Sequence, residues 1–265
     1  MVSRTKSKRV LITGSGSGIG RDAVRALADR GHSVYATTHS EAQAAWWQSV
    51  GNPRVQAFKL DITDETDRAR VTDLPIDVLV NNAALGESGS LAEVPLERVR
   101  ATFETNVFAT LALTQLVLRG MIARRSGTIL FISSLAGRVP APFLMPYAMT
   151  KFALSAAADA LRQEMAQLDR GVHIAVVEPG TYHTGFNQKM AAKKYEWMRH
   201  GSYFQDQLAA LKAQEERLFA ILELRSTRSI VRKIVQAVEA EKPRLRYVKP
   251  WWQGVGVRFL RAVGK

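Results

Sequence analysis

A tyrosine and a lysine four residues apart are the first side chains in this sequence whose types and spacing suggest chemistry. Tyr147 and Lys151 lie in the run PYAMTK, which is typical of a helix start, so both side chains should share one helical face. A free phenol with a pKa of about 10 is a poor base at neutral pH, whereas a neighbouring ammonium group lowers that pKa. The pair therefore predicts a general acid/base. Because ordinary amphipathic helices contain the same spacing by chance, the prediction depends on what lies upstream.

A glycine-rich turn near the N-terminus provides that support. The run KRVLIT at residues 8–13 is typical of a buried strand, GSGSGIG follows at 14–20, and helical spacing begins at Arg21. Strand, glycine-rich turn and helix form the context of a dinucleotide pyrophosphate site, because glycines let the backbone approach the phosphates and a helix N-terminus attracts anions. A flexible turn that binds no ligand is the alternative.

With these two motifs the chain resembles the short-chain dehydrogenase/reductase family. Residues 13–20 match its Thr-Gly-x-x-x-Gly-x-Gly cofactor motif, and NNAA at residues 81–84 is similar to its Asn-Asn-Ala-Gly motif, with Ala84 in place of glycine. The motifs follow the family order over about residues 8–185. The resemblance implies an NAD(P)-dependent oxidoreductase that acts on a secondary alcohol or ketone.

The resemblance also implies roles for single residues. Tyr147 would exchange a proton with the substrate oxygen, and Lys151 would lower the pKa of the phenol and bind the nicotinamide ribose. Ser134, favoured over Ser133 by its spacing, would orient the reacting oxygen, and Asn106 would hold a water that links Lys151 to solvent. The implied cofactor contacts are Gly14, Ser15, Ser17, Gly18, Ile19, Gly20, Thr38, His39, Asp61, Ile62, Asn82, Ala83, Tyr147, Lys151, Pro179, Gly180 and Thr184.

Two of these cofactor contacts have close competitors. Asp61 would lie near the adenine amino group, but it is equally a good helix cap. Thr184 would contact the carboxamide of the nicotinamide, and Thr181 is the neighbouring alternative.

The end of the second expected strand bears on the choice of cofactor. An acid there binds the ribose 2′-hydroxyl of NAD, and a basic residue accommodates the 2′-phosphate of NADP. This chain has Thr38-His39-Ser40 at that point and no acid, while Arg21 could add positive charge. We therefore expect NADP(H) to be favoured over NAD(H).

Composition limits the classes of protein that remain. The 265 residues contain no cysteine, which excludes disulfides and thiolate chemistry, and the histidines lack metal-ligand spacing. The first apolar run is too short for a signal peptide. No stretch is expected to be long enough to span a membrane, since Val107–Arg119 suits only a buried helix. We expect a cytoplasmic protein.

Apolar runs alternate with helical patterns along the chain. This alternation predicts a single domain over 1–265, an α/β Rossmann-like doubly wound parallel sheet of about seven strands with helices on both faces. Gly14, Asn82, Ser134 and Pro179 each follow a strand, so they should meet at the carboxyl edge of the sheet. Expected strands are 8–13, 33–38, 54–59, 77–81, 127–133, 172–177 and 245–248; expected helices are 18–30, 41–50, 64–71, 96–124, 147–168, 203–222 and 227–240.

Two segments lie outside the motifs. Residues 185–226 are rich in aromatic residues and are expected to form a substrate lid, although surface helices are the plainer interpretation.

The C-terminal region carries much of the positive charge. Eleven Lys or Arg and two Glu lie between Arg225 and Lys265, within a net charge of +13. The basic, Trp-containing tail at about 241–265 suits peripheral membrane contact, an anionic partner, a subunit contact or packing within the protein, and the last two are slightly favoured. For the charge itself, a solvated basic face is favoured over binding to nucleic acid or to an anionic membrane surface.

The favoured hypothesis is an NADPH-preferring oxidoreductase for a fairly apolar alcohol or ketone, such as a steroid, retinoid or polyketide. A 3-oxoacyl-carrier-protein-type reductase is the enzymatic alternative. A non-catalytic dinucleotide-sensing protein that binds an anionic partner is the other class. The resemblance further implies a homodimer or homotetramer built on the helices near 96–124 and 147–168.

Overall fold

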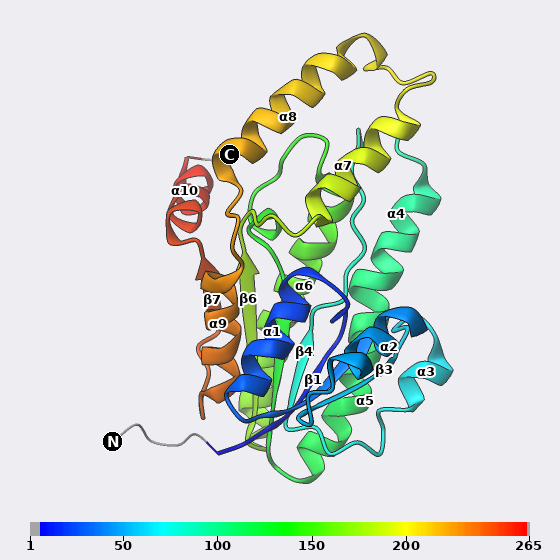
Figure 1. The fold of residues 1–265 in the computed structure, drawn as a ribbon. Coiled ribbons are helices and arrows are strands. Elements are labelled where there is room, and N and C mark those ends of the chain that lie inside the picture. The colour runs from blue at the N-terminus through cyan, green and yellow to red at the C-terminus, as the bar shows by residue number, and fades with distance from the viewer. Residues whose placement is uncertain (1–5, 264–265) are drawn as a thin grey trace.

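The computed structural model describes residues 6–263, which form a seven-stranded sheet covered by helices on both faces (Figure 1). Every pair of neighbouring strands is parallel, and the order β3-β2-β1-β4-β5-β6-β7 reverses between β1 and β4. This confirms the expected doubly wound sheet, whose switch point lies between β1 and β4. The strands are β1 Arg9–Ile12, β2 Ser33–Thr38, β3 Val55–Lys59, β4 Val78–Asn81, β5 Gly127–Ile132, β6 Val172–Pro179 and β7 Arg246–Lys249.

The helices α1, α2, α3, α6 and α9 agree with the expectations, and the others differ from them. They are α1 Gly18–Asp29, α2 Glu41–Val50, α3 Glu65–Ala69, α4 Leu96–Phe103, the π-helical segment η1 Glu104–Ala109, α5 Thr110–Ala123, the 3₁₀ turn η2 Leu135–Gly137, α6 Met145–Leu168, α7 Phe186–Trp197, the 3₁₀ turn η3 Gln205–Gln207, α8 Leu208–Leu222, α9 Arg228–Glu239 and α10 Trp251–Ala262. The expected helix 96–124 contains the η1 interruption, the expected helix 203–222 begins only at 208, and α7 and α10 were not expected. Their patterns are difficult to read because their apolar residues do not face a core.

Alternate residues of each strand point to opposite faces of the sheet, and each face is covered by its own helices. Val10 and Ile12 pack with α1, α9 and Trp47 of α2, whereas Leu11 packs with α5 and α6 on the other face. Such strands, buried on both faces, are the reason for the continuous apolar runs in the sequence.

The helical run Leu96–Ala123 requires a correction. It is long and apolar enough to cross a membrane by length and composition, so the expectation that no stretch would reach that length is wrong. Half of its most apolar window is buried inside the protein, and Leu113, Val117 and Met121 belong to the core beneath the sheet. Apolar side chains on this run therefore serve as a packing surface for β4 and β5.

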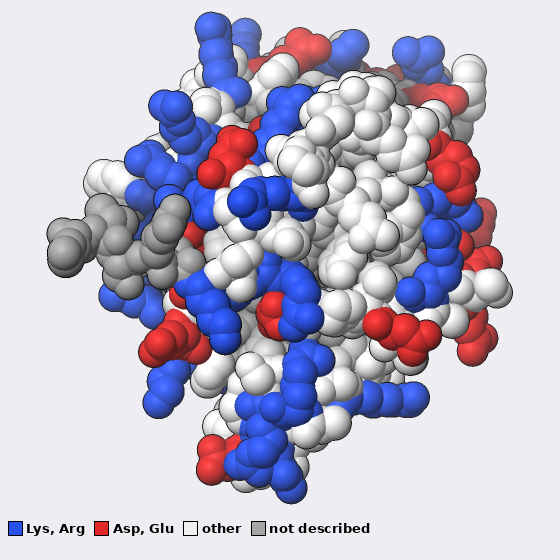
Figure 2. Space-filling view, turned by 60° about the horizontal axis from the view of Figure 1, so that its bottom comes forward, with Lys and Arg blue, Asp and Glu red and all other residues white. Residues whose placement is uncertain are grey.

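Charged side chains are distributed widely over the face seen in Figure 2. Lys and Arg, with Asp and Glu between them, lie mainly toward the left, the bottom and the rim of this face, around a white area that carries no charge. This distribution agrees with a solvated basic surface.

Candidate active site

The loops that follow β1, β4, β5 and β6 meet at the carboxyl edge of the sheet. Asn82, directly after β4, donates from Nδ2 to the carbonyls of Thr13 at 2.9 Å and Gly14 at 3.0 Å. The hydroxyl oxygen of Thr13 accepts from the backbone N–H groups of Asn82 and Ala83, both at 3.0 Å. The first loop is thus fixed to the fourth strand at the switch point, where open α/β sheets bind their ligands.

Glycine is required at several points of the first loop. Gly14 and Gly18 have φ of 67° and 54°, a region that glycine enters without steric cost. A Cβ on Gly14 would lie 2.7 Å from Ala83 Cα, and one on Gly20 would lie 2.5 Å from the Gly14 carbonyl oxygen. Trp47 Nε1 donates to the carbonyl of Ser15 at 3.0 Å and holds the loop from α2.

The N-terminus of α1 is available to an anion. Ser17 at the N-cap makes no side-chain capping bond, and the first turn carries no acid. These free N–H groups and the glycine backbone fit a pyrophosphate group, because both a helix N-terminus and closely approaching backbone favour phosphate oxygens. The dinucleotide that the loop motif implies therefore fits the residues present.

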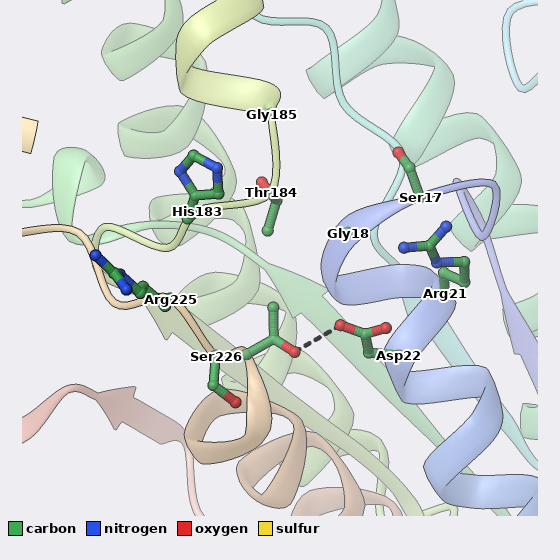
Figure 3. Close-up of a pocket in the computed structure, with 10 residues that line it drawn as sticks. Ser17, Gly18, Arg21, Asp22, His183, Thr184, Gly185, Arg225 and Ser226 are labelled. Atoms are coloured by element: carbon green, nitrogen blue, oxygen red, sulfur yellow. Dashed lines mark hydrogen bonds between the residues drawn. The ribbon is translucent and has the colours of Figure 1, made fainter.

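A cavity of about 660 Å³ lies beside this loop (Figure 3). Arg21 on α1 and Arg225, near the end of the segment 185–226, both line it, together with His183 and Thr184. Asp22 is engaged by the Thr227 hydroxyl, which donates to it at 2.6 Å. Arg225 was not foreseen, because no motif marks it and only the return of the chain after α8 brings it here.

The candidate catalytic side chains lie between β5 and the first turns of α6. Lys151 is buried and donates from Nζ to the Ile132 carbonyl at 2.9 Å, with Nζ 5.5 Å from the centre of the Tyr147 ring. Ser134 Oγ accepts from the Ala136 N–H at 3.1 Å and donates to the Pro179 carbonyl at 3.4 Å, and it lies near enough to the Tyr147 phenol to lower the pKa of that group. Ser133 points elsewhere, since its hydroxyl is bonded to Ser155 at 2.8 Å and to the Lys151 carbonyl at 3.1 Å. The structure thus brings Ser134, Tyr147 and Lys151 together.

Asn106 lies within η1 and is fully buried. Its Oδ1 accepts from the backbone N–H of Leu85 at 2.7 Å, and its Nδ2 donates to the Leu85 carbonyl and to the Thr150 hydroxyl. The Asn106 side chain therefore joins the loop after β4 to α6. Its contact on α6 is Thr150, the residue directly before Lys151. A water held by Asn106 stays a prediction.

The pKa values differ from the simple expectation for this pair. Burial raises the pKa of Tyr147, and the nearby Ser134 hydroxyl offsets only part of that rise. Burial also lowers the pKa of Lys151 to about 8. The expected lowering of the phenol pKa by Lys151 is not found between these two side chains, because the ammonium group donates to Ile132 and desolvation dominates.

The residues expected around the adenosine half lie near the ends of β2 and β3. Thr38 is buried and its hydroxyl donates to the Ser40 carbonyl, so it offers little to a ligand. His39 is exposed and its Nδ1 lies 3.4 Å from Asp61 Oδ2. Burial would raise the pKa of Asp61, but hydrogen bonds from Thr63 and the charge of His39 hold it below its ordinary value. Ile62 is buried in the core.

A cationic cluster adjoins this corner. Arg21 and Arg25 lie over the Trp46 ring at 5.8 and 5.5 Å, and the buried Nε of Arg21 has no partner among the described residues. An unpaired buried donor is costly, so Arg21 is suited to an anionic ligand group.

The segment after β6 approaches the glycine loop. Pro179 ends β6, and the Gly180 N–H donates to the Lys249 carbonyl at 2.8 Å. A Cβ on Gly18 would lie 3.0 Å from Thr184 Cβ, which places Thr184 against the loop. Thr181 instead donates its N–H to Gln253 Oε1 at 2.9 Å.

Residues 185–226 rise above the carboxyl edge as α7, η3 and α8 (Figure 1). Glu223 joins the two ends of this segment: it accepts from Asn187 and Gln188 near its start and lies 2.7 Å from His183 Nδ1. The bridge between Tyr182 and Leu224 adds a backbone link. These contacts therefore hold the start and the end of residues 185–226 together.

Apolar groups face the candidate tyrosine. The Phe186 ring lies 5.5 Å from the Tyr147 ring, and Phe204 of the same segment packs edge-on against Phe143 at 5.0 Å. A ligand between the segment and α6 would meet rings as well as the hydroxyl groups of Ser134 and Tyr147.

Comparison with known proteins gives consistent matches. The family model described as short chain dehydrogenase matches residues 8–195. A solved short-chain dehydrogenase from Streptomyces avermitilis is 27% identical, with a TM-score of 0.74, over 97% of this chain and 92% of that one. The matching solved structures include chains with NADP bound and chains with NAD bound.

Two characterised relatives cover most of the chain. The NADPH-dependent 3-dehydrocapnine reductase of Ornithobacterium rhinotracheale is 30% identical over 90% of this chain and 86% of its own length. The estradiol 17-beta-dehydrogenase 1 of Rattus norvegicus is 32% identical over 90% of this chain and 72% of its own length.

Proposed function

The chain belongs to the short-chain dehydrogenase/reductase family of oxidoreductases, which act on CH–OH and C=O groups, and on that premise we propose that it interconverts a secondary alcohol and a ketone with NADPH as the favoured cofactor. One observation carries the proposal: Ser134, Tyr147 and Lys151 meet at the same sheet edge as the glycine loop. A dinucleotide laid across that edge brings its reactive end to these hydroxyl groups.

When bound, the nicotinamide supplies or accepts the hydride. Tyr147 is the general acid that gives its proton to the carbonyl oxygen during reduction, and its raised pKa keeps it protonated at neutral pH. Ser134 holds the same oxygen and fixes its orientation. Lys151, with a pKa of about 8, carries positive charge at neutral pH and stabilises the phenolate that remains.

The substrate that fits is fairly apolar. Phe186 faces Tyr147, and Phe204 with Phe143 forms a second aromatic contact under the lid. Two relatives are named for estradiol and for 3-dehydrocapnine as their substrates.

The preference for NADPH is supported by charge at the end of β2. The run Thr38-His39-Ser40 contains no acid and His39 is exposed, while the buried Nε of Arg21, beside Trp46, has no partner within residues 6–263. A 2′-phosphate at this corner gains charge-assisted bonds that a 2′-hydroxyl does not. A relative named as NADPH-dependent points in the same direction.

Fluorescence titration of the purified chain with NADPH and with NADH tests this proposal. We expect a Kd for NADPH at least about tenfold lower, which equals ~1.4 kcal/mol. Arg21→Gln should lose most of that difference, whereas Arg170→Gln, an exposed arginine at the far end of α6, should keep it. Tighter NADH binding would contradict the cofactor preference and leave the enzyme class intact, and binding of neither would contradict the glycine-loop assignment.

A reductase of acyl-carrier thioesters is the second candidate function. The observation that favours it is the positive charge of the C-terminal region, where no acid occurs from Lys242 onward and which could attract an acidic carrier protein. Turnover of free ketones without turnover of 3-oxoacyl thioesters would exclude this candidate.

We also propose that the enzyme is a homodimer or homotetramer built on α4, α5 and α6. Leu96 on α4 and Phe108 on η1 are 62% and 57% exposed, and an apolar groove of about 580 Å³ lies between Val99, Phe103 and Phe108. Exposed apolar residues concentrated on one surface are typical of subunit contacts.

Light scattering with Phe108→Glu tests this assembly. A buried charge at the contact should weaken self-association by at least about tenfold, so the variant should be monomeric at a concentration where the parent is not. Val50→Glu, which changes an exposed apolar residue at the end of α2, is the matched control. If both variants retain the assembly of the parent, the subunit contact lies elsewhere.

A further inference from the structure

The last helix exposes an apolar stripe that is not covered by the residues the structure describes. Trp251, Val255 and Phe259 of α10 are 67%, 53% and 66% exposed, and their spacing of four residues places them on one face of the helix. Trp252 and Leu260 lie beside this stripe and are each 40% exposed. In Figure 1, α10 occupies the outer edge of the molecule, beyond β7 and α9. Packing within the protein, one of the two slightly favoured interpretations, holds for Tyr247 but not for Trp251 and Phe259, and the other, a subunit contact, stays a prediction.

The charge around this stripe has one sign. Seven Lys or Arg and no Asp or Glu occur from Lys242 to Lys265. Arg258 and Arg261 lie on α10 itself and are exposed. A helix with aromatic residues on one face and cations beside them is suited to the headgroup region of an anionic bilayer. The net charge of +13 adds long-range attraction to such a surface.

The inner face of α10 is held by specific contacts close to the active site. Gln253 accepts from the Thr181 N–H at 2.9 Å and donates to the Leu222 carbonyl at 2.8 Å. A Cβ on Gly254 would lie 2.7 Å from Val248, so the helix lies directly on β7. These contacts fix the orientation of α10 and leave the apolar stripe pointing away from the protein.

We propose that α10 docks the enzyme on the surface of an anionic lipid bilayer. Trp251, Val255 and Phe259 enter the boundary of the acyl chains, and Arg258 and Arg261 contact lipid phosphates. Because Gln253 joins α10 to the segment after β6 and to the end of α8, docking holds the lid next to the bilayer. An apolar substrate is concentrated there; this consequence rests on the proposed function, whereas docking itself does not.

Vesicle flotation with the full-length chain tests the proposal without measuring turnover. The probes are vesicles of phosphatidylcholine alone and of phosphatidylcholine with phosphatidylglycerol in equal parts. We expect binding to the mixed vesicles only, with a shift of tryptophan fluorescence to shorter wavelength. The double variant Trp251→Ser, Phe259→Ser should bind at least about tenfold more weakly, and Arg258→Gln with Arg261→Gln should lose much of the binding at low salt.

A matched double variant keeps the test independent of general hydrophobicity. Val50→Ser with Leu168→Ser removes two exposed apolar residues at helix ends far from α10, and it should bind vesicles as the parent does. The proposal is overturned if the parent does not bind, if binding does not depend on phosphatidylglycerol, or if the α10 and control variants behave alike. Dissociation of an oligomer by the α10 variant, with no vesicle binding by the parent, would assign the stripe to a second copy of the chain.

Discussion

Replacing Tyr147 with phenylalanine is expected to lower the turnover of a ketone substrate by ~10²–10⁴-fold, the usual contribution of a positioned general acid/base. The change removes one oxygen atom from a half-buried ring that packs against Phe186, so the fold and the glycine loop should be unaffected. Binding of NADPH, measured by fluorescence titration, should stay at the parent value. Loss of turnover with intact cofactor binding separates a catalytic role from a structural one.

The matched control is Tyr203→Phe, because Tyr203 is 80% exposed in the lid and is not part of the candidate site. This variant should turn over substrate at the parent rate. Unchanged turnover in Tyr147→Phe would contradict the catalytic assignment and favour a dinucleotide-sensing protein, since binding alone needs no proton donor. Loss of cofactor binding in the same variant would instead show that the phenol holds the ligand.

Lys151→Met is expected to change how stability depends on pH. The pKa of Lys151 is about 8 in the folded protein against 10.5 for an ordinary lysine, because burial disfavours its charge. Below pH 8 the fold therefore contains a buried charge that destabilises it. Between about pH 8 and 10.5 the unfolded chain still holds the Lys151 proton, whereas the folded protein has lost it. The free energy of unfolding of the parent therefore rises by ~3 kcal/mol over this range.

Urea denaturation at pH 7 and pH 10, without cofactor, measures this effect. At each pH the free energy of unfolding of Lys151→Met is subtracted from that of the parent. This difference should be larger at pH 10 than at pH 7 by most of the ~3 kcal/mol. Methionine fits because it retains the length and apolar stem of lysine. The exposed Lys212→Met should show the same difference from the parent at both pH values. A pH-independent difference for Lys151→Met would mean that Lys151 is not desolvated.

Lys151 also shows which properties of the site can be predicted from local sequence and which cannot. The Tyr-x-x-x-Lys spacing correctly predicted that both side chains share the start of one helix, because helical geometry depends only on neighbours along the chain. The direction of the phenol pKa could not be predicted in that way. It depends on how completely the fold removes water from Tyr147 and on the Ile132 carbonyl that engages Lys151, and both come from elements distant in sequence.

In the C-terminal third of the chain, some helices could be predicted from the sequence and others could not. Helix α9 was predicted because its apolar residues face the core, whereas α7 and α10 were not, because their apolar residues face the active site or the surface. Arg225 and Gln253 carry no motif, and they reach Thr184 and Thr181 only because the chain returns after the lid.

Sequence by itself determined the parallel sheet, the glycine loop, and the identity and order of Ser134, Tyr147 and Lys151. The sheet depends on strand periodicity, the loop on backbone angles that glycine adopts, and the Tyr147–Lys151 pair on spacing within one helix, all of which are local. Ser134 and the order of the motifs came from the family resemblance. Tertiary structure alone decided that Arg225 lies beside the glycine loop, that Glu223 joins the two ends of residues 185–226, and which face of α10 stays exposed. Those outcomes depend on burial and on contacts between distant segments, which no local pattern encodes.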